Sequence, residues 1–305
     1  MEIRVLRYFL ETAREGNMTR AAQRLHISQP TMSKQLKELE QELGAKLFLR
    51  SNYSVKLTQA GLLLRERAED ILSLVEKTQG EFRSLEQLSR GDIYVGAPES
   101  EAMGLFAQAV RDLQQTYPGI RCNVYSGNMT DVCERLDRGL LDFAIIMGVP
   151  DRTKYDALAL PSRDRWGLLL RRDDPLAEKP QFAVSDLAGL PLICSRQWMD
   201  QEFPKWFGPA ARELNITATY NLVFNGSVMV RAGMGCAVVL DRLVNTGTDS
   251  DLVFRPLVGV RSADMYIIWR RYQTFTPVAG LLLEALQQRF PPEEDNIRGS
   301  AGAEG

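Results

Sequence analysis

The stretch LHISQPTMSKQLKELE, residues 25–40, contains the start of an amphipathic helix. Ser28 can cap this helix, and Pro30 suits its first turn. On a helical wheel the apolar stripe consists of Met32, Leu36, Leu39 and Leu43, and the polar stripe of Gln29, Pro30, Ser33, Lys34 and Lys37. The apolar stripe can hold the helix on other helices, while the amide, hydroxyl and ammonium groups suit base edges and phosphate oxygens.

The flanking segments predict a complete DNA-binding unit. Residues 1–15 have a helical apolar period, Thr19 can cap a second helix, and Gly44 can end the third. Residues 47–58 contain two β-like pieces around a Ser-Asn turn, which indicates a wing hairpin. Taken alone, the polar stripe of the third helix is best interpreted as a solvated face. The preceding helix and turn and the following basic wing instead favour a helix that enters a groove of DNA.

A long helix is predicted from Thr58 to about residue 88. Its apolar residues recur at alternating spacings of four and three, the seam of a helix that packs along another helix. The seam comprises Leu64, Ala68, Ile71, Val75, Thr78, Phe82 and Leu85. A helix of about 30 residues is roughly 45 Å long and cannot bury such a stripe by itself. Dimerisation through residues 58–90 is therefore expected, and packing on the chain's own first domain is the alternative.

Beyond Arg90-Gly91 the pattern changes to alternating strands and helices, which predicts an α/β domain with parallel strands. The first set comprises strands at 93–97, 121–126 and 142–148 with helices near 101–116 and 130–139. The second set comprises strands at 166–172, 185–195, 217–224 and 236–240 with helices near 203–214 and 227–233. A strand at 265–271 and a helix near 277–289 close the fold, and residues 291–305 are expected to be a disordered tail.

Composition excludes several classes of protein. The chain is 45% hydrophobic and 25% charged, as in soluble globular proteins, and charged residues interrupt the N-terminal apolar pattern, unlike a signal peptide. No apolar run approaches the roughly 20 residues of a membrane span. The four cysteines lie far apart and His26 is the single histidine, so we predict no metal, no other cofactor and no disulfide framework. No catalytic constellation can be assembled, so an enzyme is not expected, and the cytoplasm is the predicted compartment.

Charge is distributed unevenly along the chain. The formal net charge is −2, but residues 1–60 carry +4 and the remainder −6. A basic end on an acidic body suits a polyanionic partner for the first segment only.

The segment AAQRLHISQPTMSKQLKELEQELGAKLFLRSNYSVKLTQAG, residues 21–61, resembles the winged helix-turn-helix of LysR-type transcriptional regulators. Shared features include the double alanine, Ser-Gln-Pro, Leu47-Phe48-x-Arg50 and Leu57-Thr58-x-Ala60-Gly61. RLDRGLLDFAII (135–146), DLAGLPLIC (186–194) and VRAGMGCAVVL (230–240) resemble landmarks of the family's effector domain. The resemblance implies an overall α/β protein with an N-terminal all-α winged helix-turn-helix at 1–60, a linker helix at 58–90 and a periplasmic-binding-protein-like effector domain at 91–290. It implies that lobe I consists of 91–161 and 267–290 and lobe II of 162–266.

The resemblance also implies contacts and partners. Promoter DNA would contact Thr19, Ser28, Gln29, Pro30, Thr31, Ser33, Lys34, Lys37, Arg50, Lys56 and Thr58. Dimerisation would use Leu64, Ala68, Ile71, Val75, Phe82 and Leu85. The expected assembly is a homodimer or homotetramer in the bacterial nucleoid, with RNA polymerase as a further candidate partner.

A small effector is expected between the lobes, where strand ends and helix N-termini converge. The residues expected around it are Ser100, Asn128, Met129, Thr130, Met147, Arg196, Trp198, Asn225 and Ser227. Hydroxyls beside free N–H groups suit a carboxylate or another small anion, although Glu99 would repel an anion if it pointed inward. Helix capping is the alternative for Ser100, Thr130 and Ser227, and packing is the alternative for Trp198.

Two rival functions follow from the same fold. A transport binding protein would need export, for which the sequence provides no signal peptide. A redox-responsive regulator of the same family would switch through cysteines, but Cys194 and Cys236 stand far apart in the sequence.

Overall fold

The computed structural model describes residues 1–50, 54–85, 90–201, 203–208 and 214–291. These residues form two compact units, Met1–Arg83 and Ser84–Gly305. The expected tail, residues 291–305, lies outside the described part except for Pro291, as does the Ser51-Asn52 turn of the wing.

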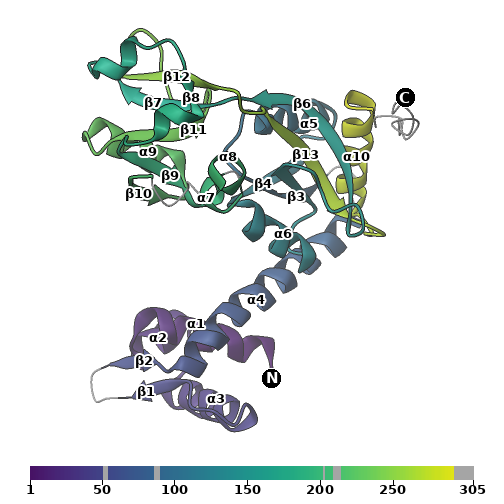
Figure 1. Ribbon diagram of the computed structural model, residues 1–305. Coiled ribbons are helices and arrows are strands. Elements are labelled where there is room, and N and C mark those ends of the chain that lie inside the picture. Colours follow the sequence, from purple (N-terminus) through teal and green to yellow (C-terminus); the bar gives the residue numbers. More distant parts are fainter. Residues whose placement is uncertain (51–53, 86–89, 202, 209–213, 292–305) are drawn as a thin grey trace, which may run out of the picture. The chain divides into compact units, whose positions relative to one another are not determined.

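The first unit is a helix-turn-helix with a hairpin. Its elements are α1 (Ile3–Glu15), α2 (Met18–Arg24), α3 (Gln29–Glu42), β1 (Phe48–Arg50), β2 (Val55–Leu57) and α4 (Gln59–Leu85), which continues two residues into the second unit. Figure 1 shows α1, α2, α3 and the antiparallel β1–β2 hairpin gathered around the first turns of α4. The three helices, the turn and the wing are therefore as predicted.

The helix caps differ in one respect from the sequence-based expectation. Ser28 caps α3 as predicted, because its side chain accepts a hydrogen bond from the backbone N–H of Thr31. The prediction that Thr19 caps α2 is wrong, since Asn17 is the cap and accepts from the N–H groups of Thr19 and Arg20. Asn17 lies directly after Gly16, whose left-handed conformation (φ 57°) ends α1. Only Gly16 and Asn17 therefore separate α1 from α2.

The apolar stripe of α3 enters the core of the first unit. Met32 and Leu36 are fully buried, and Leu39 is nearly so. Leu43 is an exception to the prediction, since it is 42% exposed. It follows the last helical residue, Glu42, and therefore leaves the apolar side of the helix.

The beginning of the α4 seam packs on its own DNA-binding unit. Leu64 and Ala68 belong to the core that α1 and α3 build, and Ile71 packs against it. For Leu64 and Ala68 the alternative interpretation is correct, because a single chain buries them. A role of the half-buried Ile71 in dimerisation stays a prediction. Further along, Phe82 is 68% exposed, and the side chain of Leu85 lies outside the described part.

The second unit contains two sheets, which form two lobes. The lobe I sheet has the strand order β4-β3-β5-β13-β6. Its elements are β3 (Arg90–Ala97), α5 (Ala102–Thr116), β4 (Gly119–Ser126), α6 (Met129–Asp137), β5 (Phe143–Met147), β6 (Tyr155–Asp164), β13 (Ala263–Arg270) and α10 (Pro277–Arg289). Strand β3 pairs in parallel with β4 and β5, while β13 runs antiparallel to β5 and β6. The sequence pattern did not predict β6.

The lobe II sheet has the strand order β10-β9-β11-β7-β12-β8. Its elements are β7 (Trp166–Arg171), η1 (Pro175–Glu178), β8 (Phe182–Ala183), η2 (Val184–Leu187), β9 (Leu192–Ser195), α7 (Arg196–Gln201), α8 (Phe203–Phe207), β10 (Ile216–Tyr220), α9 (Val223–Arg231), β11 (Cys236–Leu240) and β12 (Leu252–Val258). The predicted strand 217–224 is wrong at its end, because β10 stops at Tyr220 and α9 begins at Val223. Strand β12 was not predicted.

The chain crosses between the lobes close to the expected positions. It leaves lobe I after Asp164 and returns between Val258 and Ala263. The expected boundaries at 161/162 and 266/267 therefore fall inside β6 and β13. Among the residues that the structure describes, no helix is both long and apolar enough to span a bilayer.

Candidate functional site

The polar side of α3 is open to solvent within the first unit. Gln29, Pro30, Thr31, Lys34 and Lys37 are exposed, and Ser33 is half-buried. The Lys34 side chain is 77% exposed, and its ammonium lies 3.9 Å from Glu38, an exposed pair that contributes little. Both lysines can therefore move toward a phosphate or a base edge.

The first turn of α3 has its hydroxyl groups already ordered. The Ser28 and Thr31 hydroxyls lie 2.7 Å apart, and the Gln29 amide nitrogen lies 3.6 Å from the Met18 sulfur. Thr19, at the start of α2, is exposed on the same unit. These groups flank a helix N-terminus, where free N–H groups favour a phosphate.

The wing contributes one described basic side chain. Lys56 is exposed on β2, while the side chain of Arg50 lies outside the described part. Thr58 is engaged by the fold, because its hydroxyl donates to the Lys46 carbonyl at 2.6 Å and accepts from the Gly61 N–H at 3.0 Å. A DNA contact of Thr58 stays a prediction, and it would have to use a hydroxyl that the fold already holds in place.

Glu40 joins α3 to the wing, a role that the sequence did not indicate. Its carboxylate accepts hydrogen bonds from the N–H groups of Leu47 at 2.9 Å and Phe48 at 3.3 Å, and it pairs with Lys46 at 3.2 Å. Burial would raise the pKa of the Glu40 carboxyl, but these hydrogen bonds and the Lys46 charge lower it below its ordinary value. The wing is thereby fixed against the helix that carries Lys34 and Lys37.

The second unit has a cavity of about 70 Å³ between its lobes, which is partly open to solvent. Three of the predicted effector residues line it, namely Asn128, Met147 and Arg196. The sequence analysis missed most of the apolar lining, which comprises Pro98, Trp166, Tyr220, Leu222, Val223, Val239, Leu240, Leu243 and Met265. These residues come from five separate stretches of the chain, so no local pattern could have identified them together.

The remaining predicted effector residues are placed elsewhere. Trp198 is fully buried and packs edge-on against Phe203 and Trp206, so packing is the correct interpretation. Ser100 is buried, and its hydroxyl donates to Asp164 at 2.6 Å. Met129 and Thr130 belong to α6 and are not among the residues that line the cavity.

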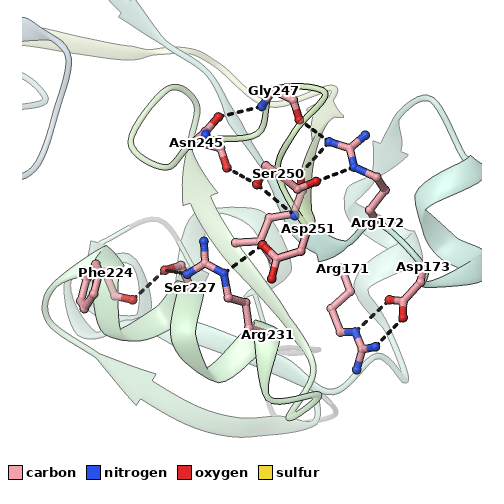
Figure 2. Close-up of polar contacts among 11 residues, drawn as sticks. Arg171, Arg172, Asp173, Phe224, Ser227, Arg231, Asn245, Gly247, Ser250 and Asp251 are labelled. Carbon is pink, nitrogen blue, oxygen red and sulfur yellow. Dashed lines mark hydrogen bonds and ion pairs between the residues drawn. The ribbon is translucent and has the colours of Figure 1, made fainter.

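Asn225 and Ser227 both lie inside α9 and are not among the residues that line the cavity. Figure 2 shows the Ser227 hydroxyl turned toward the Phe224 carbonyl and Arg231. Arg231 in turn pairs with Asp251 at 3.0 Å. Ser227 therefore belongs to a polar cluster of lobe II that does not line the cavity.

Glu99 reaches from lobe I to lobe II and lines the cavity. Its side chain accepts a hydrogen bond from the N–H of Val223, the first residue of α9. The residue at the N-cap of α9 is Leu222, whose side chain cannot accept a hydrogen bond. Glu99 therefore supplies the cap from the other lobe, in accord with the preference of helix N-termini for negative charge.

Two Asp-Arg dipeptides pair with each other, one at the crossover from lobe I to lobe II and the other directly after β11 in lobe II. Arg165 donates to Asp241 through its backbone N–H at 3.0 Å and its side chain at 2.9 Å. Arg242 donates to Asp164 at 3.4 Å. Both carboxylates are buried, and both arginine side chains are more than half exposed.

The cysteines closest to a redox arrangement are buried. Cys194 on β9 and Cys236 on β11 lie on adjacent strands and on one face of the sheet, because Cys194 pairs with Val238 and Cys236 with Leu192. Burial raises the pKa of the Cys194 thiol to about 12 and that of Cys236 to about 11. The two cysteines are therefore neighbours in space although they stand far apart in the sequence. Both thiols are nevertheless protonated at neutral pH and shielded from solvent.

Comparison with known proteins agrees with this architecture. A family model described as the LysR substrate binding domain matches residues 86–291, and one described as a bacterial regulatory helix-turn-helix protein of the lysR family matches residues 3–62. The HTH-type transcriptional regulator YtlI of Bacillus subtilis (strain 168) is 30% identical over 225 residues, 72% of each chain. The hydrogen peroxide-inducible genes activator of Pectobacterium carotovorum subsp. carotovorum is 32% identical over 194 residues, which cover 63% of this chain and 64% of that protein.

Solved structures show the same fold. The crystal structure of CbnR, a LysR family transcriptional regulator, has a TM-score of 0.75 at 23% identity, covering 94% of this chain and 99% of that one. Full-length CbnR complexed with its target DNA gives a TM-score of 0.73 at the same identity and coverage. Since the substrate-binding-domain match alone spans more than half of the sequence, the chain belongs to the LysR family of transcriptional regulators, with an N-terminal helix-turn-helix and a C-terminal effector-binding domain.

Proposed function

We propose that the protein is a sequence-specific regulator that inserts the polar side of α3 into the major groove of promoter DNA under the control of a small anionic effector. The observation that carries this proposal is the division of α3 into a buried stripe with Met32 and Leu36 and an exposed side with Lys34 and Lys37. The buried stripe anchors the helix, so its polar side is presented in a fixed direction.

The contacts with DNA would fall into three groups. Gln29, Ser33 and Lys34 would face base edges, while Ser28, Thr31 and the first N–H groups of α3 would hold a phosphate. Lys37, Lys56 and Arg50 would bind the backbone, together with Thr19. The net charge of +4 over residues 1–60 supports this assignment, as does the DNA complex of CbnR.

The effector would bind in the cavity between the lobes. Asn128 and Arg196 line it and can hold an anionic group, while Met147 and the other apolar residues can hold a hydrocarbon part. Because the lining comes from both lobes, a ligand there would stabilise one relative position of the lobes over others. This change would alter the spacing or bend of the bound DNA.

The protein would assemble as a homodimer or a homotetramer. It would act on nucleoid DNA in the bacterial cytoplasm, with RNA polymerase as a further partner. It would catalyse no reaction of its own. Exposed apolar residues in the second half of α4 support a helix pair there, since Leu74 is 42% and Phe82 68% exposed. Val75, half-buried within one chain, belongs to the same stretch.

The redox-responsive alternative has weaker support. Hydrogen peroxide-inducible activators are among the relatives, but the raised pKa values of Cys194 and Cys236 leave few thiolates to react.

The DNA-binding proposal is tested by selecting duplexes from a randomised pool with the full-length protein. Enrichment of an interrupted dyad, whose affinity falls on Lys34→Ala, is the expected result. A matched control is Lys205→Ala in lobe II, which should leave affinity unchanged. Failure to enrich any sequence over several rounds, with a folded protein, would contradict sequence-specific binding.

A further inference from the structure

The cavity between the lobes already contains a carboxylate that belongs to the protein. Glu99 holds one carboxylate oxygen, Oε2, against the N–H of Val223. Its second oxygen accepts no hydrogen bond from any residue that the structure describes. A ligand in the cavity therefore meets an acceptor with a negative charge on the lobe I side.

The other charged residue of the lining has the opposite sign and comes from the other lobe. Arg196 is the first residue of α7 and follows β9, whereas Glu99 follows β3. Within the described part of the chain, no carboxylate forms an ion pair with Arg196. The lining of the cavity thus contains one negative and one positive side chain, and each can form an ion pair with a ligand.

The rest of the lining is mainly apolar. Trp166, Leu240, Leu243 and Met265 form part of it, and Tyr220 directs its hydroxyl away to the Val238 carbonyl at 2.8 Å. A purely anionic ligand would suit Arg196 but would approach the Glu99 charge in surroundings where water screens it less than in bulk. A purely cationic ligand would have the converse problem at Arg196.

We propose that the effector is a small amphoteric molecule, an amino acid with an apolar side chain or a close analogue, whose ammonium group faces Glu99 and whose carboxylate faces Arg196. Such a ligand is neutral overall, matches both charges and fills the apolar part with its side chain. It bridges the lobes, because its two charged groups bind residues from different lobes. This inference rests on the proposed regulatory function and the same cavity, but it replaces the anionic effector proposed above with a molecule that carries both charges.

The test uses matched sets of three compounds on the full-length protein. Each set contains an apolar amino acid, its des-amino acid and its decarboxylated amine, for example phenylalanine, 3-phenylpropionate and phenethylamine, with equivalent sets for leucine, valine and methionine. Thermal shift identifies binders, and calorimetry measures their affinities. We expect one or more amino acids to bind about tenfold more tightly than either partner compound in the set, since each partner lacks one charge pair.

Two charge-removing variants separate the Glu99 effect from a general change of charge. In Glu99→Gln the advantage of the amino acid over its des-amino acid should disappear, and the des-amino acid itself should bind more tightly. Glu101→Gln removes the same charge two residues away from an exposed position and should leave the advantage intact. Arg196→Gln should remove the advantage of the amino acid over the amine.

Each other outcome overturns the inference in a distinguishable way. If the des-amino acids bind as tightly as the amino acids, the anionic effector of the proposed function stands and the amphoteric class is wrong. If the amines bind best, both are wrong. If no compound of any set binds, the amphoteric inference is rejected, while the duplex selection decides separately whether the protein is a DNA-binding regulator.

Discussion

Asp164, the last residue of β6, accepts a hydrogen bond from Arg242 at 3.4 Å, across the crossover that joins the two lobes. Asp164 also accepts from the Ser100 and Ser162 hydroxyls at 2.6 and 2.7 Å and is fully buried. Ser100 follows Glu99, and Leu243 follows Arg242, so this carboxylate lies next to two residues of the cavity wall. The polar cluster around Asp164 therefore contributes both to the relative position of the lobes and to the shape of the cavity.

Asp164→Asn should destabilise the effector domain by about 1–3 kcal/mol, because a buried group loses charge-assisted hydrogen bonds. Denaturant unfolding of the full chain measures this change. Asp264→Asn serves as the control, since Asp264 is exposed and its side chain forms no hydrogen bond or ion pair with another described residue. Equal stability of the two variants would show that the Asp164 cluster contributes nothing specific.

Glu40→Gln should loosen the wing and cost about 1–3 kcal/mol of stability in the DNA-binding unit. The folded-state pKa of Glu40 lies below its ordinary value of 4.5, so its charge stabilises the fold above that pH and the contribution is lost as the pH falls through the lower folded value. The wild-type unit should therefore lose stability on acidification from pH 5 to about pH 3 more steeply than the variant. Unfolding curves across that range provide the measurement, with exposed Glu38→Gln as the control.

Arg50→Ala should weaken binding to all duplexes and flatten the salt dependence, whereas Lys34→Ala or Gln29→Ala should mainly reduce the preference for the selected site. The physical reason is that a phosphate contact is independent of sequence, while a contact with a base edge is not. Mobility-shift titrations on selected and scrambled duplexes at several salt concentrations measure both effects. Equal losses on the two duplexes for all three variants would contradict the assignment.

Gly61→Ala should destabilise the first unit by about 2 kcal/mol or more, because its Cβ atom would lie 2.2 Å from the Leu47 carbonyl oxygen. The same helix offers a matched control, since a Cβ atom at Gly80 would meet nothing within 4 Å. Gly80→Ala should stabilise α4 by about 0.5–1 kcal/mol through higher helix propensity. Thermal unfolding of both variants decides the matter, and a neutral Gly61→Ala would mean that α4 can move away from the wing.

The wild-type protein should bind DNA with the same affinity under reducing and oxidising conditions. The Cys194→Ser variant should behave in the same way. Because burial raises the pKa of Cys194 to about 12 and that of Cys236 to about 11, almost all of both thiols is protonated near neutral pH. Mass spectrometry after iodoacetamide treatment should find both unmodified in the folded protein. Rapid modification, together with an oxidant-dependent affinity that Cys194→Ser abolishes, would restore the redox alternative.

The helix-turn-helix could be predicted because its signals are local. Ser28 caps α3 from three residues away, and the period of Met32, Leu36 and Leu39 fixes the buried side within one helix. Gly16 likewise ends α1 through its own backbone conformation.

Only the tertiary structure decided the cavity and its charges. Glu99 and Val223 are 124 residues apart, and the Cys194 and Cys236 strands become neighbours only through the strand order β9-β11. Leu64 and Ala68 followed a correct helical period, yet the period could not tell whether a second chain or the same chain would cover them. Periodicity specifies which side of an element is apolar, whereas the partner of that side depends on how distant segments close on one another, and no residue pattern within either segment records that choice.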